Sequence, residues 1–409
     1  MSHFDRSYLI GVEKLMTMFP VVSVLGARQV GKSTLLHQLL PGSPYFDLER
    51  HADFERISSD PDFFLDSQPT PIVIDAAQLC PGLFQALRVK VDQARQQNGR
   101  YLISGSSSPE LLKNVSESLA GRVAIMELSP FLLEESWKKK PSDFYQLIST
   151  QQFSSLDILE TRYTKTQLYT SCLYGGYPDH FLNRENQLFT GQWMENYFQT
   201  YIARDIRRLF PGIASQTFRR FVKMMAFASG QIINFSNFAR SLDVSQPTVK
   251  SYFSIAEGTF LWRMLPSFNI NYVKRIVKMP RGHIRDTGLI TSLLNIHSID
   301  ALVSHPDFGR IWESFIIEQL IQGFKKDLIP INTSYYRTHD GREIDLILEG
   351  PFGIIPIEIK AGSTVRSSSL YAIKAFIETH SCPIGIVINQ SGEVSMLSAR
   401  LIQIPASYL

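Results

Sequence analysis

A short segment near the start of the sequence has the residue types and spacing of a phosphate-binding loop. It runs from Gly26 to Ser33 and fits the pattern G-x-x-x-x-G-K-[ST]. Glycines let the backbone turn so that amide groups point at phosphate oxygens, Lys32 reaches the β- and γ-phosphates, and the Ser33 hydroxyl ligates Mg²⁺. The segment therefore predicts the binding of a nucleoside triphosphate. The expected contacts come from Gly26, Arg28, Gln29, Val30, Gly31, Lys32, Ser33 and Thr34.

Asp75 supplies a second group that such a site needs. It ends the apolar run that begins at Pro71, which is typical of a buried strand. An aspartate at this point can hold Mg²⁺ through the metal's water shell. The next residue is ordinarily a glutamate that polarises the attacking water, but in this chain it is Ala76.

A further set of charged residues lies in two neighbouring segments near the end of the chain. Glu343 and Asp345 alternate with apolar residues in the first, and Glu358 and Lys360 do so in the second. Residues two apart in a strand share a face. If the two strands form a hairpin around residues 350–353, the symmetric register places Asp345 opposite Glu358 and Glu343 opposite Lys360.

Acids gathered in this way are costly unless a cation neutralises them or function demands them. The spacing of these residues resembles that of the metal-dependent PD-(D/E)xK nucleases, and Glu313, in a helix predicted over residues 311–324, matches the additional acid of such folds. The resemblance implies a cation held by Glu313, Asp345 and Glu358, with Glu343 and Lys360 beside it. The alternative is a half-exposed hairpin with ordinary cross-strand ion pairs.

The middle of the chain carries clusters of basic residues. Arg and Lys are concentrated at 204–208 and 219–223, and a third run extends from Lys274 to Arg285 without an acid until Asp286. Between them, residues 234–262 have the proportions of a helix-turn-helix, with a second helix from Ser245. This combination resembles a winged-helix module that binds DNA. The alternative is a small helical domain whose arginines pair with acids elsewhere. The predicted DNA contacts are Gln246, Thr248, Lys250, Lys274, Arg275 and Lys278.

The elements that must position these residues predict an α/β fold. Short apolar segments alternate with helical patterns at the start of the chain, which is typical of a parallel sheet covered by helices. We expect an ATPase-type domain over 1–135, a helical linker region over 136–215, a winged-helix-like domain over 216–305 and a nuclease-like α/β domain over 306–409. The first domain's expected strands are Val21–Leu25, Tyr45–Leu48, Ile72–Asp75, Tyr101–Ser104 and Val123–Leu128.

With these motifs in place, the chain resembles the AAA-type ATPases of bacteria and archaea that carry a restriction-endonuclease-like C-terminal domain of the PD-(D/E)xK kind. The resemblance runs almost from end to end. It implies ATP with Mg²⁺ at the first site, and a possible second Mg²⁺ or Mn²⁺ held by the C-terminal acids, whether or not that domain cuts DNA. By the same resemblance, Lys32, Asp75, the polar residues Ser104 and Ser106, and Arg122 are catalytic.

The sequence departs from this family at Ala76. Family members look like Asp-Glu-x-Gln where this chain has Asp-Ala-Ala-Gln. A natural loss and a deliberate substitution that traps the triphosphate both fit this change. Either way, we expect a form that binds ATP and hydrolyses it poorly.

Composition limits the remaining possibilities. The formal net charge of +3 is too small to identify a nucleic-acid binder by itself, and the three cysteines are widely spaced. No long apolar run predicts a membrane span, so we expect a cytoplasmic protein. The family resemblance favours a homo-oligomer.

Together these features predict an ATPase that couples Mg-ATP to the binding or remodelling of DNA. Two alternatives stay open at this point. One is a nucleotide-dependent signalling or defence switch whose middle domain binds a protein. The other is a plain nuclease in which ATP is only structural.

Overall fold

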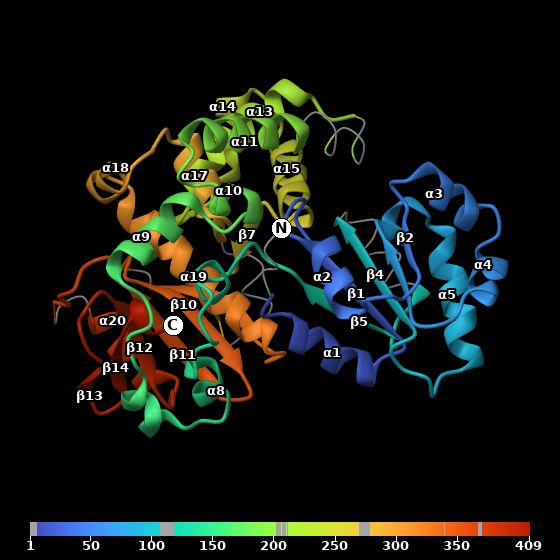
Figure 1. The fold of residues 1–409 in the computed structure, drawn as a ribbon. Coiled ribbons are helices and arrows are strands. Elements are labelled where there is room, and N and C mark those ends of the chain that lie inside the picture. Colours follow the sequence, from blue (N-terminus) through green and yellow to red (C-terminus); the bar gives the residue numbers. More distant parts are fainter. Residues whose placement is uncertain are drawn as a thin grey trace. The chain divides into compact units, whose positions relative to one another are not determined.

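A computed structural model describes residues 6–106, 118–201, 206, 210, 212–269, 279–338, 340–366 and 370–409. Its contacts divide the chain into two compact units (Figure 1). One comprises Met1–Pro130 with Ile255–Phe260, and the other comprises Phe131–Ser254 with Leu261–Leu409. The finer division into four parts stays a prediction.

The first unit is built on a five-stranded sheet in the order β2-β3-β4-β1-β5, in which neighbouring strands are parallel. Strands β1 and β3 are buried along their whole length, because parallel strands have both faces covered by helices. All five strands expected in this part are confirmed. They are β1 (Val21–Gly26), β2 (Tyr45–Asp47), β3 (Ile72–Asp75), β4 (Tyr101–Ser106) and β5 (Val123–Glu127).

Helices join these strands, and the strand order fixes where a ligand can bind. The chain leaves β1 toward β3 and β2 on one side, but β5 lies on the other side of β1. In open α/β sheets, ligands bind at the carboxyl ends of the strands, where the order reverses in this way. The helical elements are α1 (Leu9–Met18), α2 (Lys32–Leu39), α3 (His51–Ser58), α4 (Pro61–Ser67), η1 (Ala77–Leu79) and α5 (Gly82–Gln93).

The second unit starts with short helices, in the part of the chain where the sequence predicted a helical linker region. Buried side chains such as Phe144 and Ile148 anchor these helices. They are α7 (Leu133–Ser136), α8 (Phe144–Ser149), η2 (Phe153–Ile158), α9 (Lys165–Tyr174), α10 (Pro178–Leu182) and α11 (Gln187–Thr200).

Three helices and a small sheet follow. Asn234 caps α14 through its side chain, and Asp243 ends it with a left-handed backbone, so the chain turns directly into α15. The antiparallel sheet has the order β6-β8-β7. The elements are α13 (Ser215–Ala228), β6 (Gln231–Ile232), α14 (Phe235–Leu242), α15 (Gln246–Gly258), β7 (Trp262–Leu265) and β8 (Arg281–Ile284).

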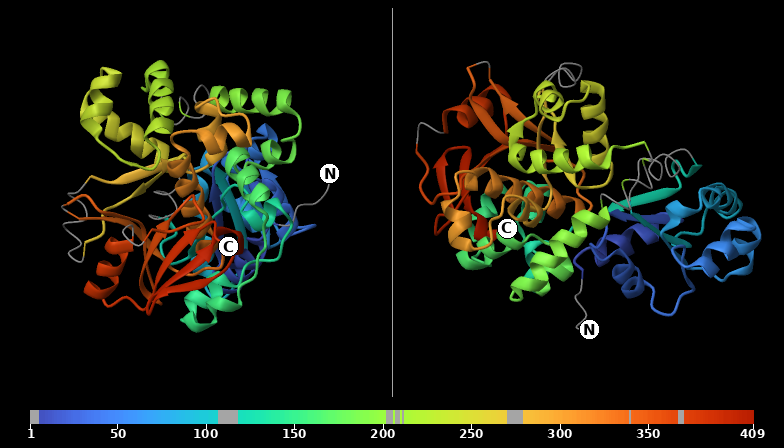
Figure 2. Two further views of the ribbon diagram at one scale, coloured as in Figure 1. Left: turned by 90° about the vertical axis from the view of Figure 1, so that its left-hand side faces the viewer. Right: turned by 90° about the horizontal axis from the view of Figure 1, so that it is seen from above.

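The chain ends in a six-stranded sheet of order β13-β14-β12-β11-β10-β9, with helix α20 packed on one face (Figure 2). The hairpin β10–β11 has the predicted symmetric register, since Leu346 pairs with Ile357 and Gly350 with Gly353. The remaining elements are α17 (Thr287–Leu293), α18 (Ile299–Ser304), α19 (Phe308–Lys326), β9 (Asn332–Arg337), β10 (Glu343–Gly350), β11 (Gly353–Ile359), α20 (Tyr371–Thr379), β12 (Gly385–Asn389), β13 (Ser395–Ser398), β14 (Leu401–Pro405) and η5 (Ala406–Tyr408).

None of the helices within the described ranges has the length and apolar character needed to cross a membrane.

Candidate functional site

The predicted phosphate loop joins the end of β1 to the start of α2, as the motif requires. Gly31 has a φ of 91°, a left-handed conformation that favours glycine. Gly26 is needed for another reason, because a Cβ there would lie 2.4 Å from the carbonyl oxygen of Leu128. Both motif glycines are therefore explained by backbone geometry, and the loop lies at the carboxyl edge of the sheet.

Lys32 lies in the first turn of α2 and folds back over the loop. Its Nζ donates hydrogen bonds to the carbonyl oxygens of Gly26, at 3.0 Å, and Ala27, at 2.7 Å. The side chain is half-buried. An ammonium held in this position lies over the loop whose amides are expected to surround the phosphates, so it can exchange these carbonyls for phosphate oxygens.

The carboxylate of Asp75 is the centre of a hydrogen-bond network at the end of β3. Its Oδ2 accepts from the Ser33 hydroxyl at 2.5 Å and from the Tyr45 hydroxyl at 2.6 Å. Its Oδ1 accepts from the Ser104 hydroxyl and from the backbone N–H of Ala76 at 2.8 Å. The structure thus brings together three residues predicted for this site, namely Ser33, Asp75 and Ser104.

The protonation of Asp75 follows from this network. Burial raises the pKa of Asp75, but the hydrogen bonds from Ser104, Ser33 and Tyr45 outweigh burial and bring the pKa below its usual value. The carboxylate is therefore charged at neutral pH. A carboxylate beside a serine hydroxyl at the mouth of the loop is the donor set that Mg²⁺ takes together with nucleotide phosphates, so these residues fit Mg-ATP.

Ala76, at the position of the expected glutamate, has a left-handed backbone with a φ of 56°. The residue is buried. Its methyl group has no acid–base chemistry, so no carboxylate stands next to Asp75 in the chain.

The other predicted nucleotide-site residues are placed less centrally. Arg122 binds Asp92 through two hydrogen bonds of 2.9 Å and reaches the Ala120 carbonyl. In this arrangement its guanidinium pairs with a carboxylate of α5. Arg28 is half-buried within the loop. Ser106 ends β4, and its side chain lies outside the described residues.

Two residues of the site were missed from the sequence. Tyr45, at the start of β2, binds Asp75 across the sheet and stacks on His37 with ring centroids 4.0 Å apart. Arg6 is buried and donates to the carbonyl oxygens of Val30 and Ser129. Neither residue lies in a motif. The pairing of β2 with β3, which places Tyr45 beside the strand that carries Asp75, is a signal that could have indicated Tyr45.

The predicted C-terminal cluster is also brought together, but around an arginine. Arg281, from β8, forms ion pairs with Glu313 on α19 and with Asp345 on β10, the latter at 3.2 Å. Glu358 on β11 pairs with Lys360. Within the described part of the chain, no group of three or more His, Cys, Asp or Glu side chains is arranged to hold a metal ion.

Glu343 lies apart from this cluster. It pairs with Arg337 on β9 at 3.3 Å, and its side chain is one-third exposed. The sequence placed it opposite Lys360, whereas the described pairing of β10 with β11 extends from Leu346 to Gly350. A register shift between β9 and β10 next to Ile344 accompanies this arrangement.

Two buried acids of the cluster, Glu313 and Glu358, have raised pKa values. Burial raises the pKa of Glu358 to about 8, and the neighbouring Asp345 adds to the effect. Burial and Asp345 also raise the pKa of Glu313 well above its ordinary value. In the part of the chain that the structure describes, Oε2 of Glu358 is buried without a hydrogen-bond partner. Burial thus favours the protonated form of these two carboxyl groups.

The basic middle of the chain is partly exposed and partly buried. Gln246 and Lys250 are exposed on α15, and Thr248 is half-buried there; Lys250 lies over the ring of Phe235. The predicted contacts Lys274, Arg275 and Lys278 lie outside the described residues.

Two arginines of the third basic run, Arg281 and Arg285, pair with acids, as the alternative of a helical domain with paired arginines expects. Both side chains are buried, at 6% and 8% exposed. Arg285, with Arg263 and His283, surrounds the carboxylate of Glu318 on α19. These two arginines pair with acids because β8 packs inward, and strand direction could not be read from charge alone.

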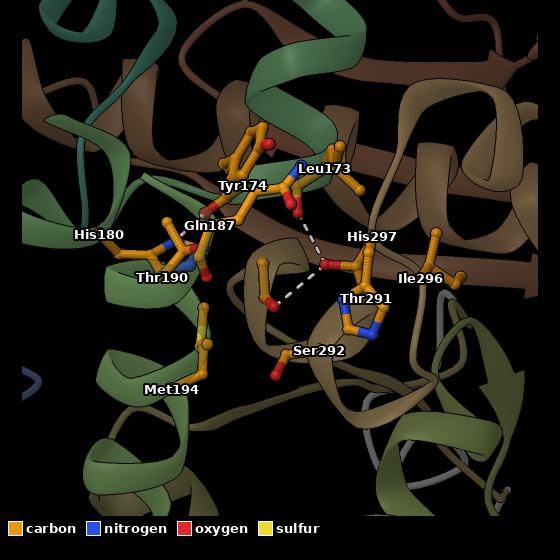
Figure 3. A pocket seen from close by; sticks show the side chains of 12 residues that line it. Leu173, Tyr174, His180, Gln187, Thr190, Met194, Thr291, Ser292, Ile296 and His297 are labelled. Atoms are coloured by element: carbon orange, nitrogen blue, oxygen red, sulfur yellow. Dashed lines mark hydrogen bonds between the residues drawn. The ribbon is translucent and has the colours of Figure 1, made fainter. Parts of the chain in front are cut away.

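A separate cavity of about 340 Å³ lies among α9, α10, α11 and α17 (Figure 3). Thr291 at its wall donates to the carbonyl oxygens of Leu173 and Gly288. His180 is buried there, and its pKa falls to about 4 because burial disfavours the charged ring. Thr291 and His180 are thus engaged with the protein itself, since the His180 Nδ1 also lies 2.8 Å from the Tyr174 carbonyl oxygen.

Comparison with solved structures finds weak global likeness. The Walker-type ATPase PABY2304 of Pyrococcus abyssi is 14% identical, with a TM-score of 0.43, over 71% of this chain and 96% of that one. A RuvB variant of Thermotoga maritima is 12% identical, with a TM-score of 0.30, over 64% of this chain and 86% of that one. Nothing about function follows from scores of this size.

Three family models match successive segments of the chain, whereas its contacts divide it into two units. Residues 18–137 match an AAA domain, residues 165–300 match a domain of unknown function (DUF8612), and residues 308–409 match another (DUF4143). The AAA match covers the phosphate loop, Asp75 and Ser104. The N-terminal unit is thus an AAA-type ATPase domain with a site suited to ATP.

Two mycobacterial proteins are similar over most of the chain. Uncharacterized protein Rv2008c of Mycobacterium tuberculosis and uncharacterized protein Mb2031c of Mycobacterium bovis are each 36% identical over 350 residues, which is 84% of this chain and 71% of theirs. The chain belongs to the family of these two proteins, as a member whose AAA-type domain carries the phosphate loop and the acid of a nucleotide site.

Proposed function

We propose that this protein is an AAA-type ATPase that couples the binding and hydrolysis of Mg-ATP to the engagement of DNA. The observation that carries the proposal is the joint position of Lys32 and Asp75. Lys32 folds over the phosphate loop. At the same edge of the sheet, Asp75 accepts a hydrogen bond of 2.5 Å from the Ser33 hydroxyl.

Each residue has a distinct task in the proposed site. The loop amides hold the phosphates, and Lys32 neutralises them. Ser33 and Asp75 hold Mg²⁺, which would supply charge stabilisation at the phosphates. The Ser104 hydroxyl donates a hydrogen bond to Asp75, and it can change partner when Mg²⁺ binds that carboxylate.

Ala76 makes hydrolysis the weak step in this proposal. General-base positioning contributes roughly 10²–10⁴-fold to a rate. The Ala76→Glu variant should therefore hydrolyse ATP faster than the parent by about that factor, with similar ATP affinity. Measured turnover in both forms tests this; equal rates would show that position 76 does not activate water.

The DNA part of the proposal is supported by the order of elements in the middle of the chain. Helix α13, strand β6, helices α14 and α15, and then strands β7 and β8 follow one another, with β8 between its two partners in the sheet. This succession is typical of a winged helix, in which the helix that follows the turn, here α15, enters the major groove.

Exposed basic side chains accompany α15. Arg219, Arg220 and Lys223 lie on α13, Arg240 on α14 and Lys250 on α15, and all five are exposed. Such a group supplies the salt-dependent attraction to phosphates that non-specific DNA binding needs.

Binding to duplex, forked and four-way DNA at several salt concentrations tests this part. We expect affinity that falls steeply with salt and that is weakened about tenfold by Lys250→Glu with Arg219→Glu. The matched control is Lys14→Glu, which changes an exposed lysine on α1. If no nucleic acid binds at low salt, with or without ATP, the chain is better explained as a nucleotide-dependent switch for a protein partner.

A further inference from the structure

The C-terminal cluster has an internal cation in the place where its carboxylates converge. Arg281 reaches Glu313 with one terminal nitrogen and Asp345 Oδ1 with the other, at 3.2 Å for the second. Its Nε donates to the Gly230 carbonyl oxygen at 2.9 Å. The guanidinium is thus held on three sides, and the side chain is only 6% exposed.

Two further groups of the cluster also have partners within the protein. Asp345 Oδ2 accepts from the backbone N–H of Ile359 at 2.8 Å, and the Lys360 ammonium pairs with Glu358. Oε2 of Glu358, in a residue that is only 6% exposed, has no hydrogen-bond partner among the described residues. Within that part of the chain, this buried oxygen lacks a donor.

This arrangement does not fit the divalent ion that a PD-(D/E)xK site would hold. Mg²⁺ needs oxygen ligands at about 2.0–2.1 Å in near-octahedral geometry. A guanidinium that pairs with both Glu313 and Asp345 already neutralises part of their charge, and its own positive charge repels a second cation. The same carboxylates cannot serve both, so one cation must leave before the other binds.

We infer that Arg281 is the resident cation of the C-terminal cluster and excludes divalent metal from it. The side chain that a phosphate-binding strand would expose is turned inward and neutralises the acids that a nuclease would use for metal. This inference is independent of the ATPase proposal, since no residue of the nucleotide site takes part in it.

Arg281 also connects two sheets, because it lies on β8 and pairs with Asp345 on β10. It contacts Glu313 of α19 as well, and His283, two residues further along β8, contacts Glu318 of the same helix. Burial of a charge is tolerated only when it is paired and hydrogen-bonded. The acids of the cluster therefore hold β8 against the C-terminal domain, as long as the arginine stays in place.

Binding of Mn²⁺ to the nucleotide-free full-length protein, followed by the electron paramagnetic resonance of free Mn²⁺, tests the inference. The parent protein and its Glu358→Gln variant should bind Mn²⁺ equally weakly. Arg281→Met, which keeps much of the side-chain volume, should gain a site with affinity raised by roughly tenfold or more. Adding Glu358→Gln to Arg281→Met should remove the gain.

Two results would overturn the inference. One is Mn²⁺ binding by the parent protein that Glu358→Gln abolishes, because the site would then take metal with Arg281 present. The other is a folded Arg281→Met protein, checked by circular dichroism, that gains no Mn²⁺ site. If Arg281→Met does not fold, the comparison of the parent with Glu358→Gln still decides the first point.

Discussion

The protein places buried carboxylates at two sites where the sequence predicted magnesium, and it satisfies them in different ways. Asp75 in the first unit accepts hydrogen bonds from three hydroxyl groups and a backbone N–H. Asp345 in the second unit accepts hydrogen bonds from the guanidinium of Arg281 and from a backbone N–H. Neutral donors surround the first acid, and a fixed positive charge neutralises the second.

This difference decides which site can take a metal ion. Hydroxyl groups can rotate, and each can give up its hydrogen bond to a carboxylate when a hydrated cation arrives. A buried guanidinium cannot leave without uncovering several unpaired groups. The first acid is therefore ready for an exchangeable ligand, while the second belongs to a permanent contact.

The sharpest test of the comparison is the stability of two matched variants. Asp345→Asn removes a charge that faces Arg281 and should lower the free energy of unfolding by about 3 kcal/mol. Asp75→Asn has only neutral donors around it among the described residues, and the Ser33 and Tyr45 hydroxyls can turn to accept from the new NH₂ group, so it should cost about 1 kcal/mol. Denaturant unfolding of both measures this, and equal costs would contradict the comparison.

Changes at the first site, and not at the second, should weaken the binding of ATP. Lys32→Ala removes the ammonium that lies over the loop, so we expect ATP to bind roughly 10–100-fold more weakly, as for a lost charge-assisted contact. Asp345→Asn should leave ATP affinity unchanged. Calorimetry with Lys14→Ala as the control gives the result, and unaltered binding by Lys32→Ala would refute the assignment of the loop.

The pH dependence of stability distinguishes the two acids further. The pKa of Glu358 is raised to about 8 in the folded protein, so the folded state holds a proton that the unfolded state has lost. Stability from this group is complete at acidic pH and is lost as pH rises toward about 8. Glu358→Gln should remove a loss of about 1–2 kcal/mol between about pH 6 and about pH 8. An unchanged profile by thermal unfolding would argue against this protonation.

Asp75 should behave in the opposite sense, because its folded pKa lies below the usual value. Its contribution is present above that usual value and is lost as pH falls through the folded pKa.

The smallest effect is expected from Tyr45. Tyr45→Phe removes one of the hydroxyl groups that bind Asp75 and keeps the ring that stacks on His37. The free energy of unfolding should fall by about 1 kcal/mol, with the loop intact. Tyr8→Phe is a matched control, since its hydroxyl binds Ser129 and not the acid.

Local patterns were enough to predict several features correctly. The phosphate loop, the five strands of the first sheet and the register of the hairpin β10–β11 all depend on residues close together in the chain. Glycine conformation, apolar runs and a tight turn act over a few residues, so the sequence carries them directly.

What the sequence by itself determined is therefore which side chains are available for chemistry and on which strand each one lies. Only the tertiary structure decided their partners. Tyr45 meets Asp75 because β2 pairs with β3, and Arg281 meets Asp345 because β8 packs inward. Such partners are chosen by the balance of burial and charge across the whole fold, and no short stretch of residues contains that balance.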